Sequence, residues 1–219
     1  MERTIAFVDL AGFTALTEVH GDAAALDLVD AFTSVANRAV ADVDAEIVKT
    51  IGDAVMVAAA GPAPGLEAVR RLFEACYAAP AFPDPRAGLH HGPVLPRDGD
   101  FFGATVNLAA RVASRAGSGQ VVATAVVAAE ARAQRIDTVD LGEQRLRNVL
   151  DLVPLWAVEL TPGHVDLSID PVCRMRIGCQ GAVARVRHAG AEHWLCSLDC
   201  LRAFAVDPDR YVLTEVDTR

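Results

Sequence analysis

The spacing of apolar residues over the first 160 positions limits this chain to folds that mix strands and helices. Short apolar runs rich in β-formers, such as Thr4–Asp9, alternate with a segment of helical period over Asp22–Val40. Two further runs, Ile47–Ile51 and Ala54–Ala58, are separated by only two residues, which predicts a β-hairpin. The other expected elements are helices at Leu66–Tyr77 and Thr105–Arg115, a strand with a short helix at Val121–Ala133, and strands at Arg86–Val94, Asp137–Leu146 and Leu152–Glu159. This alternation indicates an α/β or α+β sandwich.

Composition and charge exclude several classes of protein. The 219 residues include 20 Lys and Arg against 29 Asp and Glu, a formal net charge of −9. Binding to the phosphate backbone of DNA or RNA needs a basic surface, so nucleic acid is not an expected partner. The longest apolar run, Ala54–Ala60, is far shorter than the ~20 residues that span a bilayer. We expect no membrane span and, since the first residues do not resemble a signal peptide, a cytoplasmic location.

The composition changes near residue 161. Residues 161–164 read Thr-Pro-Gly-His, which is typical of a linker. Four of the five cysteines, at 173, 179, 196 and 200, follow it, and in a reducing compartment such a group indicates metal binding before disulfides. The fifth, Cys76, lies in an expected helix and is predicted to be a core residue. We expect a first domain over 1–160, a linker over 161–168 and a small Cys-rich domain over 169–219.

Two aspartates of the first domain stand where backbone geometry exposes them, and two further polar residues share a face of one expected helix. Asp9 ends the first expected strand and Asp53 lies in the hairpin turn, so two carboxylates converge if that strand pairs with the hairpin. Paired carboxylates together with substrate phosphates are a usual Mg²⁺ site. Asn107 and Arg111 share a face of an expected helix near its start, where an anion is favoured. The alternatives are that the two aspartates are simply solvated, that the asparagine only lies near a helix cap and that the arginine forms a surface ion pair.

The sequence around these four residues resembles the class III nucleotidyl cyclase catalytic domain, the adenylate and guanylate cyclase family. The resemblance rests on FVDLAGFTALTEVHGD (7–22), VKTIGDAVMVA (48–58), GLHHGPV (88–94) and DFFGATVNLAARVAS (100–114), and continues more weakly in LGEQRLRNVLDLVPLWAV (141–158). It therefore covers about the first 160 residues. It implies an α+β fold, a ferredoxin-like α/β sandwich.

The resemblance also implies roles for single residues. Asp9 and Asp53 would bind two Mg²⁺ or Mn²⁺ ions, which serve in-line phosphoryl transfer. Asn107 would orient the ribose, and Arg111 would stabilise the α-phosphate while pyrophosphate leaves and the 3′ oxygen closes the cyclic phosphate. The backbone of Gly12, Phe13 and Thr14 would approach the phosphates. A basic residue would hold the β- and γ-phosphates, for which Arg145 and Arg147 are candidates and Arg147 is favoured.

Lys49 and Asp100 fall on the family's base-reading positions. The adenine edge offers an acceptor beside a donor, and a lysine beside an aspartate supplies the complementary pair, so the resemblance implies ATP over GTP. The alternatives are a lysine on a solvated strand face and a turn aspartate after Gly99.

In this family the site forms between two chains, the metal aspartates on one and the ribose, α-phosphate and base residues on the other. This sequence carries both sets, which implies a homodimer with two equivalent sites. Phe101 and Phe102 are candidates for contacts there, with core packing as the alternative. The stretch 96–99 is short for the family's dimer-contacting arm. We expect His20, His90 and His91 to be structural.

The tail resembles the YHS domain and the related TRASH motif over about 169–212. Cys173, Cys196 and Cys200 follow the pattern C-x22-C-x3-C, and Arg174 stands where the family commonly has Gly. Three thiolates with Cys179, His188 or His193 as the fourth ligand suit Zn²⁺ or a soft ion such as Cu(I). Metal binding would either act as a sensor that regulates the protein or only stabilise a domain too small to build its own hydrophobic core.

Two functions therefore compete at this level. The first is an adenylate cyclase that converts ATP to 3′,5′-cyclic AMP and pyrophosphate and is regulated by metal binding to the tail. The second is a metal-responsive nucleotide-binding or dimerisation protein with little cyclase activity.

Overall fold

The computed structural model describes residues 1–79, 82–161, 168–177 and 181–212. The chain forms two compact units. One contains Met1–Ala11, Val29–Ala78 and Pro85–Gly163, and the other contains Gly12–Leu28, Ala79–Asp84 and His164–Arg219. Residues 162–167, most of the expected linker, lie outside the described residues, so the expected domain boundaries stay a prediction.

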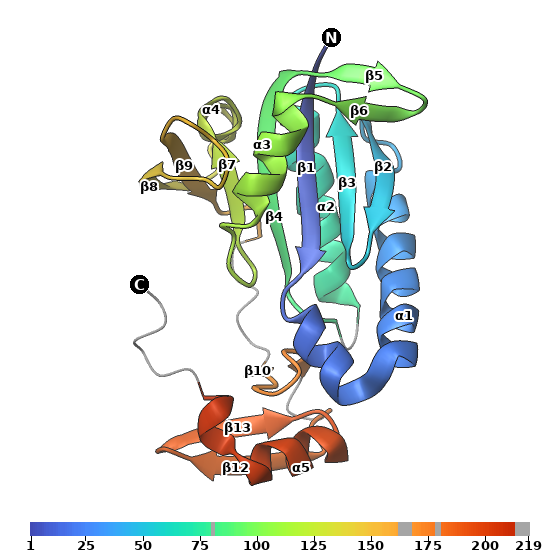
Figure 1. Cartoon of the computed structure of the whole chain (residues 1–219), viewed down its shortest axis with the longest axis vertical. Helices are drawn as coiled ribbons and strands as arrows, with labels where there is room; N and C mark the ends of the chain where they lie inside the picture. The colour runs from blue at the N-terminus through green and yellow to red at the C-terminus, as the bar shows by residue number, and fades with distance from the viewer. Residues whose placement is uncertain (80–81, 162–167, 178–180, 213–219) are drawn as a thin grey trace. The chain divides into compact units, whose positions relative to one another are not determined.

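A seven-stranded sheet forms the centre of the first unit. Its strands are β1 (Glu2–Leu10), β2 (Ala45–Ile51), β3 (Ala54–Ala59), β4 (Pro85–Pro93), β7 (Val121–Thr124), β8 (Thr138–Gln144) and β9 (Val153–Val158). They lie in the order β2-β3-β1-β4-β7-β9-β8 (Figure 1). Neighbours are antiparallel except β4 and β7, which are parallel. The expected strands and the β2–β3 hairpin are confirmed.

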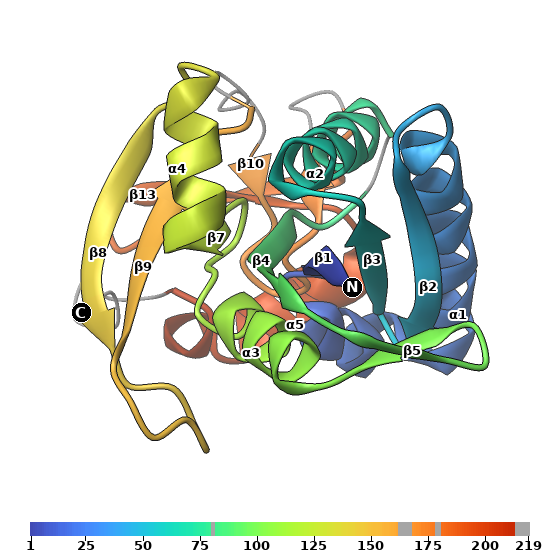
Figure 2. The ribbon, with the colours of Figure 1, turned by 90° about the horizontal axis from the view of Figure 1, so that it is seen from above.

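Helices cover both faces of this sheet, as Figure 2 shows. α2 (Pro62–Ala78) and α4 (Ala125–Ala133) contact each other and pack on one face, while α3 (Ala104–Ala113) packs on β4 and β1 from the other. Gly88 in β4 permits this approach, since a Cβ there would lie 2.0 Å from the Ala113 backbone nitrogen. The expected helices, the mixed α+β fold and the burial of Cys76 in α2 are confirmed.

The segment between β4 and α3 is more regular than its polar sequence indicates. β5 (Leu95–Arg97) and β6 (Asp100–Phe102) pair as a short antiparallel hairpin, which places Asp100 at the start of a strand. Thr105, where the expected helix begins, does not cap α3. The N-cap is Gly103, and the Thr105 hydroxyl instead donates to the Pro93 carbonyl at 2.6 Å, where it ties the helix start to the end of β4.

The long helix α1 (Phe13–Val40) contains a break. Gly21 has φ 80° and ψ 169°, which is not helical, so the expected helix from Asp22 is preceded by a separate helical stretch from Phe13. Gly12, with φ 81°, precedes this stretch, and its carbonyl accepts from the Leu16 amide at 3.1 Å. The Gly12–His20 segment belongs to the second unit.

The tail makes up most of the second unit, which also contains Gly12–Leu28 and Ala79–Asp84. β10 (Ser168–Ile169) pairs with β11 (Arg176–Ile177), and β12 (Ala184–His188) pairs with β13 (Ala191–Leu195). α5 (Leu198–Val206) and a 3₁₀ turn (Pro208–Arg210) follow. This small Cys-rich arrangement is compatible with the expected zinc-finger-like domain. Within the described part of the chain, no helix has the length and apolar character needed to cross a membrane.

Candidate functional site

The pairing of β1 with its neighbours brings Asp9 and Asp53 together. Asp9 stands opposite Ala54 in the β1–β3 register, and Asp53 is the residue before Ala54 in the hairpin turn. Burial raises the pKa of Asp53, and the negative charge of Asp9 raises it further, against a backbone hydrogen bond and the charge of Arg86. Two neighbouring carboxylates supply the hard oxygen ligands that a divalent cation prefers.

Arg86 is a site residue that the sequence reasoning missed. It lies opposite Asp9 in the β1–β4 register, and its Nε donates to Asp9 Oδ1 at 2.5 Å. The guanidinium therefore fixes the orientation of this carboxylate. Nothing in the local sequence indicates the contact, because the register of two strands 77 positions apart creates it.

α3 places Asn107 and Arg111 along one cleft of about 480 Å³. Arg147, from the segment between β8 and β9, lines the same cleft, whereas Arg145 and the metal-candidate aspartates do not. The Arg115 guanidinium donates to the Arg145 carbonyl and so anchors that segment on the end of α3. Three polar side chains, two of them cationic, can meet a phosphate-bearing ligand here.

Lys49 and Asp100 meet across β2 and the β5–β6 hairpin. Lys49 Nζ lies 2.6 Å from Asp100 Oδ2, and Asp100 Oδ1 accepts from the Phe101 amide at 2.7 Å. The Lys49 ammonium lowers the pKa of Asp100. Phe102 lies beside the pair, its ring centroid 5.8 Å from Lys49 Nζ, and is half exposed, while Phe101 is buried in the core. The pair offers one donor and one acceptor at the same place.

Two of the three singled-out histidines bond to threonines of the sheet. His90 Nδ1 lies 2.8 Å from the Thr124 hydroxyl and His91 Nδ1 lies 3.0 Å from the Thr4 hydroxyl. Burial lowers the pKa of His90, which favours its neutral form. These contacts agree with the structural role expected for both.

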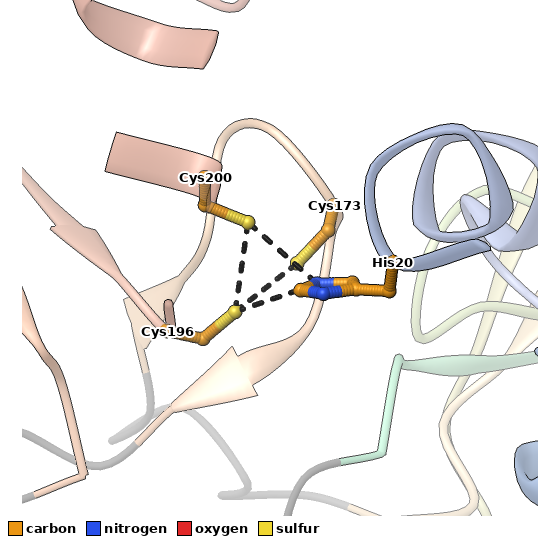
Figure 3. A group of neighbouring side chains, drawn as sticks. All are labelled: His20, Cys173, Cys196 and Cys200. Carbon is orange, nitrogen blue, oxygen red and sulfur yellow. Dashed lines mark hydrogen bonds between the residues drawn. The ribbon is translucent and has the colours of Figure 1, made fainter. Parts of the chain in front are cut away.

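The second unit gathers Cys173, Cys196, Cys200 and His20, whose four ligand atoms lie within 4.8 Å of one another (Figure 3). Hydrogen bonds from the other two thiols lower the pKa of the Cys196 thiol. Sequence reasoning found the three cysteines and missed His20, which lies 153 positions before the first of them. A group of three thiols and an imidazole can bind a metal.

The sequence offers three other candidates for the fourth ligand, Cys179, His188 and His193. Cys179 lies outside the described residues. His188 Nε2 lies 2.7 Å from Asp209 Oδ1, and His193 packs on the Phe204 ring. Neither belongs to the cluster that the described residues form.

The sequence pattern of the adenylate and guanylate cyclase catalytic domain matches residues 2–78. A pH-sensitive adenylate cyclase of Mycobacterium tuberculosis is 38% identical over 159 residues, which are 71% of this chain and 40% of that protein. An adenylate cyclase of Streptomyces griseus is 39% identical over 126 residues, 58% of this chain and 32% of that protein. The chain therefore contains a class III adenylate and guanylate cyclase catalytic domain.

Solved structures show the same cyclase fold. A monomeric adenylate cyclase structure from Trypanosoma brucei superposes with a TM-score of 0.65 at 21% identity, over 74% of this chain and 91% of that one. The chain spans less than half the length of the two bacterial relatives named above. The cyclase domain is thus the part of those proteins that this chain shares.

Proposed function

We propose that this chain is an adenylate cyclase that converts ATP to 3′,5′-cyclic AMP and pyrophosphate. The observation that carries the proposal is the convergence of Asp9 and Asp53, within a cyclase domain that also presents Asn107 and Arg111 in one cleft. The names of the bacterial relatives support adenylate rather than guanylate chemistry.

Asp9 and Asp53 would hold two Mg²⁺ or Mn²⁺ ions, with Arg86 keeping the Asp9 carboxylate in place. Bound there, such ions acidify the ribose 3′-hydroxyl and neutralise triphosphate charge. Asn107 orients the ribose so that the 3′ oxygen faces the α-phosphorus. The bond between them forms as the bond to pyrophosphate breaks. Arg111 stabilises the charge on the α-phosphoryl oxygens, and Arg147 holds the departing pyrophosphate.

We further propose that two chains complete each site. The cleft of Asn107, Arg111 and Arg147 contains neither Asp9 nor Asp53 among its lining residues. A second copy related by two-fold symmetry would bring the aspartates of one chain to the cleft of its partner and form two equivalent sites. Leu95 and Phe102 on the β5–β6 hairpin are exposed apolar side chains available for such a contact.

Lys49 and Asp100 would select adenine. The lysine donates to adenine N1 and the aspartate accepts from the exocyclic amine, whereas guanine presents the opposite polarity at both atoms. A buried polar group left unpaired penalises the wrong base, so ATP is preferred over GTP.

The test is product analysis of the purified full chain with Mn-ATP and Mn-GTP in parallel. We expect cyclic AMP and pyrophosphate in equal amounts, with Arg111→Ala lowering kcat by about a hundredfold or more. Arg38→Ala is the matched control, since Arg38 is exposed and donates to the Ser34 hydroxyl on its own helix. Nucleotide binding without turnover, unchanged in Arg111→Ala, would support the competing function of a nucleotide-binding or dimerisation protein.

A further inference from the structure

The cysteine and histidine cluster has the dimensions of a tetrahedral metal site. With Zn–S of 2.3 Å and Zn–N of about 2.05 Å, tetrahedral geometry requires about 3.8 Å between sulfurs and about 3.6 Å between sulfur and nitrogen. Cys196 Sγ lies 3.5 Å from Cys173 Sγ and 3.6 Å from Cys200 Sγ. His20 Nε2 lies 3.6 Å from Cys200 Sγ and 3.8 Å from Cys196 Sγ.

A buried carboxylate holds the loops that carry these thiols. Asp170 is fully buried, and its Oδ1 accepts from the Val172 and Cys173 amides at 2.8 and 3.4 Å. Its Oδ2 accepts from the Cys196 amide at 2.7 Å. Cys200 lies in the first turn of α5, where its amide donates to the Ser197 cap at 3.1 Å. The backbone that carries the three thiols is therefore fixed by hydrogen bonds, as support around a metal site requires.

His20 connects this cluster to the start of α1. It lies eight residues after Gly12, near the end of the helical stretch that Gly21 terminates. Gly12 begins the segment whose backbone, by the cyclase resemblance, approaches the triphosphate. The same short stretch thus has a phosphate-facing end and a metal-facing end.

The tail also contacts the Gly12 end directly. A Cβ on Gly12 would lie 2.4 Å from Arg174 Cγ and 2.5 Å from Arg174 Cβ, so the arginine stem rests against the Gly12 backbone. Arg174 adopts φ 64°, a conformation that favours glycine, and so accepts backbone strain at this position. Here the tail departs from the glycine common in its family, and the arginine supplies a contact that glycine cannot make.

We propose that His20 completes a Cys₃His zinc site with Cys173, Cys196 and Cys200, and that zinc loading holds the Gly12–His20 segment in the conformation that binds ATP. The effect on ATP rests on the proposed cyclase function, whereas the zinc site does not. With zinc bound, both ends of the segment are fixed by the tail. Without it, ordering the segment costs free energy each time ATP binds, so the KM for ATP rises.

The zinc site is tested first, without reference to activity. Zinc content and zinc affinity are measured on the full chain for wild type, His20→Ala, His20→Cys and His188→Ala. We expect one zinc per chain in wild type and His188→Ala, at least a tenfold loss of affinity in His20→Ala, and recovery in His20→Cys. Substitution of Co²⁺ gives the intense visible bands of tetrahedral coordination in wild type and weaker, shifted bands in His20→Ala. Wild-type zinc affinity and an unchanged Co²⁺ spectrum in His20→Ala would overturn the proposal.

The coupling to ATP is tested by kinetics with a thiophilic chelator and Mg²⁺ in excess. We expect zinc removal to raise the KM for ATP several-fold in wild type and His188→Ala, with a smaller change in kcat. His20→Ala should show the high KM whether or not zinc is added. A KM that does not respond to zinc in an active enzyme overturns the coupling. A chain that binds zinc through His20 but makes no cyclic AMP refutes the proposed cyclase function and leaves the zinc site standing.

Discussion

Lys49 is the one lysine among 20 basic residues, the rest being arginine. Its ammonium is a compact donor on a flexible stem, whereas a guanidinium is a rigid fork. Paired with Asp100 at 2.6 Å, it forms a donor beside an acceptor, the pattern that adenine complements. A change of arginine to lysine elsewhere in the chain would leave the net charge unaltered. At position 49 the shape of the donor matters as well as its charge.

Exchanging the polarity of this pair should weaken the preference for ATP. In the double variant Lys49→Glu with Asp100→Cys, a glutamate acceptor replaces the lysine donor and a small cysteine replaces the aspartate acceptor. We expect the ratio of kcat/KM for ATP to kcat/KM for GTP to fall by about tenfold or more. The ratio is measured from initial rates with both nucleotides. Arg97→Glu with Asp98→Cys makes the same change at an exposed ion pair of the same hairpin and should leave the ratio unaltered. An unchanged ratio in the first variant would mean that the base is read elsewhere.

At the same scale, the sequence motifs predict candidate residues for the chemistry but not the residues that support them. Asp9, Asp53, Asn107 and Arg111 stand in motifs whose order and spacing are specific to a family. Arg86 and His20 stand in no such pattern. Their contacts depend on strand register and on where a tail residue meets a helix, and neither follows from local sequence.

Among the elements, α3 shows how one small residue positions a functional helix. Thr105 at its start reaches the Pro93 carbonyl, and Ala113 at its end lies against Gly88, so the helix is seated on β4 at both ends. Asn107 and Arg111 lie between these contacts. The apolar period predicted the helix, but the glycine that admits it is visible only once α3 and β4 are placed together.

Gly88→Ala should disrupt the packing of α3 on β4. The added Cβ would lie 2.0 Å from the Ala113 nitrogen and 2.3 Å from its Cα, and backbone atoms cannot move aside as a flexible side chain can. We expect a loss of about 2 kcal/mol or more in the free energy of unfolding, measured by urea denaturation, with a loss of cyclase rate. Gly117→Ala is the control, since its Cβ would meet only the Gln120 side chain at 3.6 Å. Equal stability of the two variants would contradict the seating role of Gly88.

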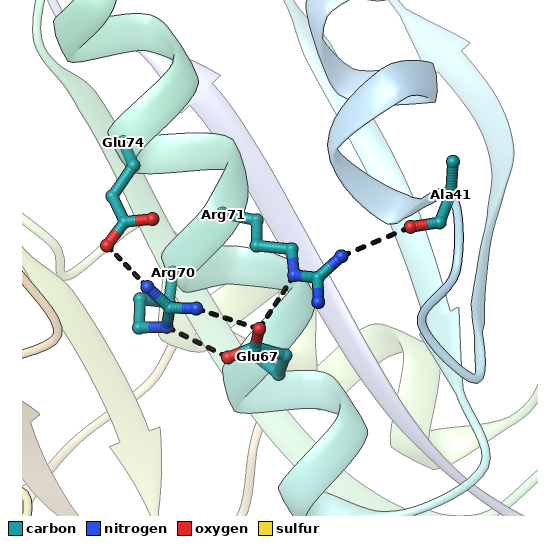
Figure 4. Close-up of polar contacts among 5 residues, drawn as sticks. All are labelled: Ala41, Glu67, Arg70, Arg71 and Glu74. Carbon is teal, nitrogen blue, oxygen red and sulfur yellow. Dashed lines mark hydrogen bonds and ion pairs between the residues drawn. The ribbon is translucent and has the colours of Figure 1, made fainter.

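α2 carries an ion-pair network whose effect depends on pH (Figure 4). Glu67 accepts from Arg70 and Arg71, which lower its pKa from 4.5 to about 2, and Arg71 also donates to the Ala41 carbonyl beyond α1. A lowered carboxyl pKa stabilises the fold above pH 4.5, and this contribution is lost as the pH falls from 4.5 towards 2.

We therefore expect Glu67→Gln to reduce the free energy of unfolding by about 1 kcal/mol at neutral pH, because the network is partly exposed. The difference from wild type should shrink between pH 4.5 and 2, as followed by urea denaturation across that range. Glu74→Gln is the matched control, since Glu74 pairs only with Arg70 among the contacts described. A difference that is constant with pH would show that charge is not its source.

Over the whole molecule, the fold class and most elements of the first 160 residues followed from the sequence, because apolar period and hairpin spacing are local signals. The β5–β6 hairpin did not, since its strands are only three residues long and depend on pairing with each other. The helical stretch from Phe13 to His20 was missed as well, since Gly21 interrupts the period. The grouping of this stretch with the tail has no signal in a linear reading.

The proposed dimer divides the site between two chains, and a mixing experiment tests this division. Asp53→Ala removes a metal ligand and Arg111→Ala removes the α-phosphate contact, so each variant alone should be nearly inactive. When equal amounts are co-refolded, half of the dimers pair one chain of each kind and contain one intact site, which restores about one quarter of wild-type activity. Asp9→Ala mixed with Asp53→Ala is the control and should restore nothing, because both variants lack the same half. Recovery is measured as cyclic AMP formed per chain. If the first mixture stays as inactive as its parents while the chains exchange, both halves of the site must come from one chain, and the two-fold arrangement is refuted.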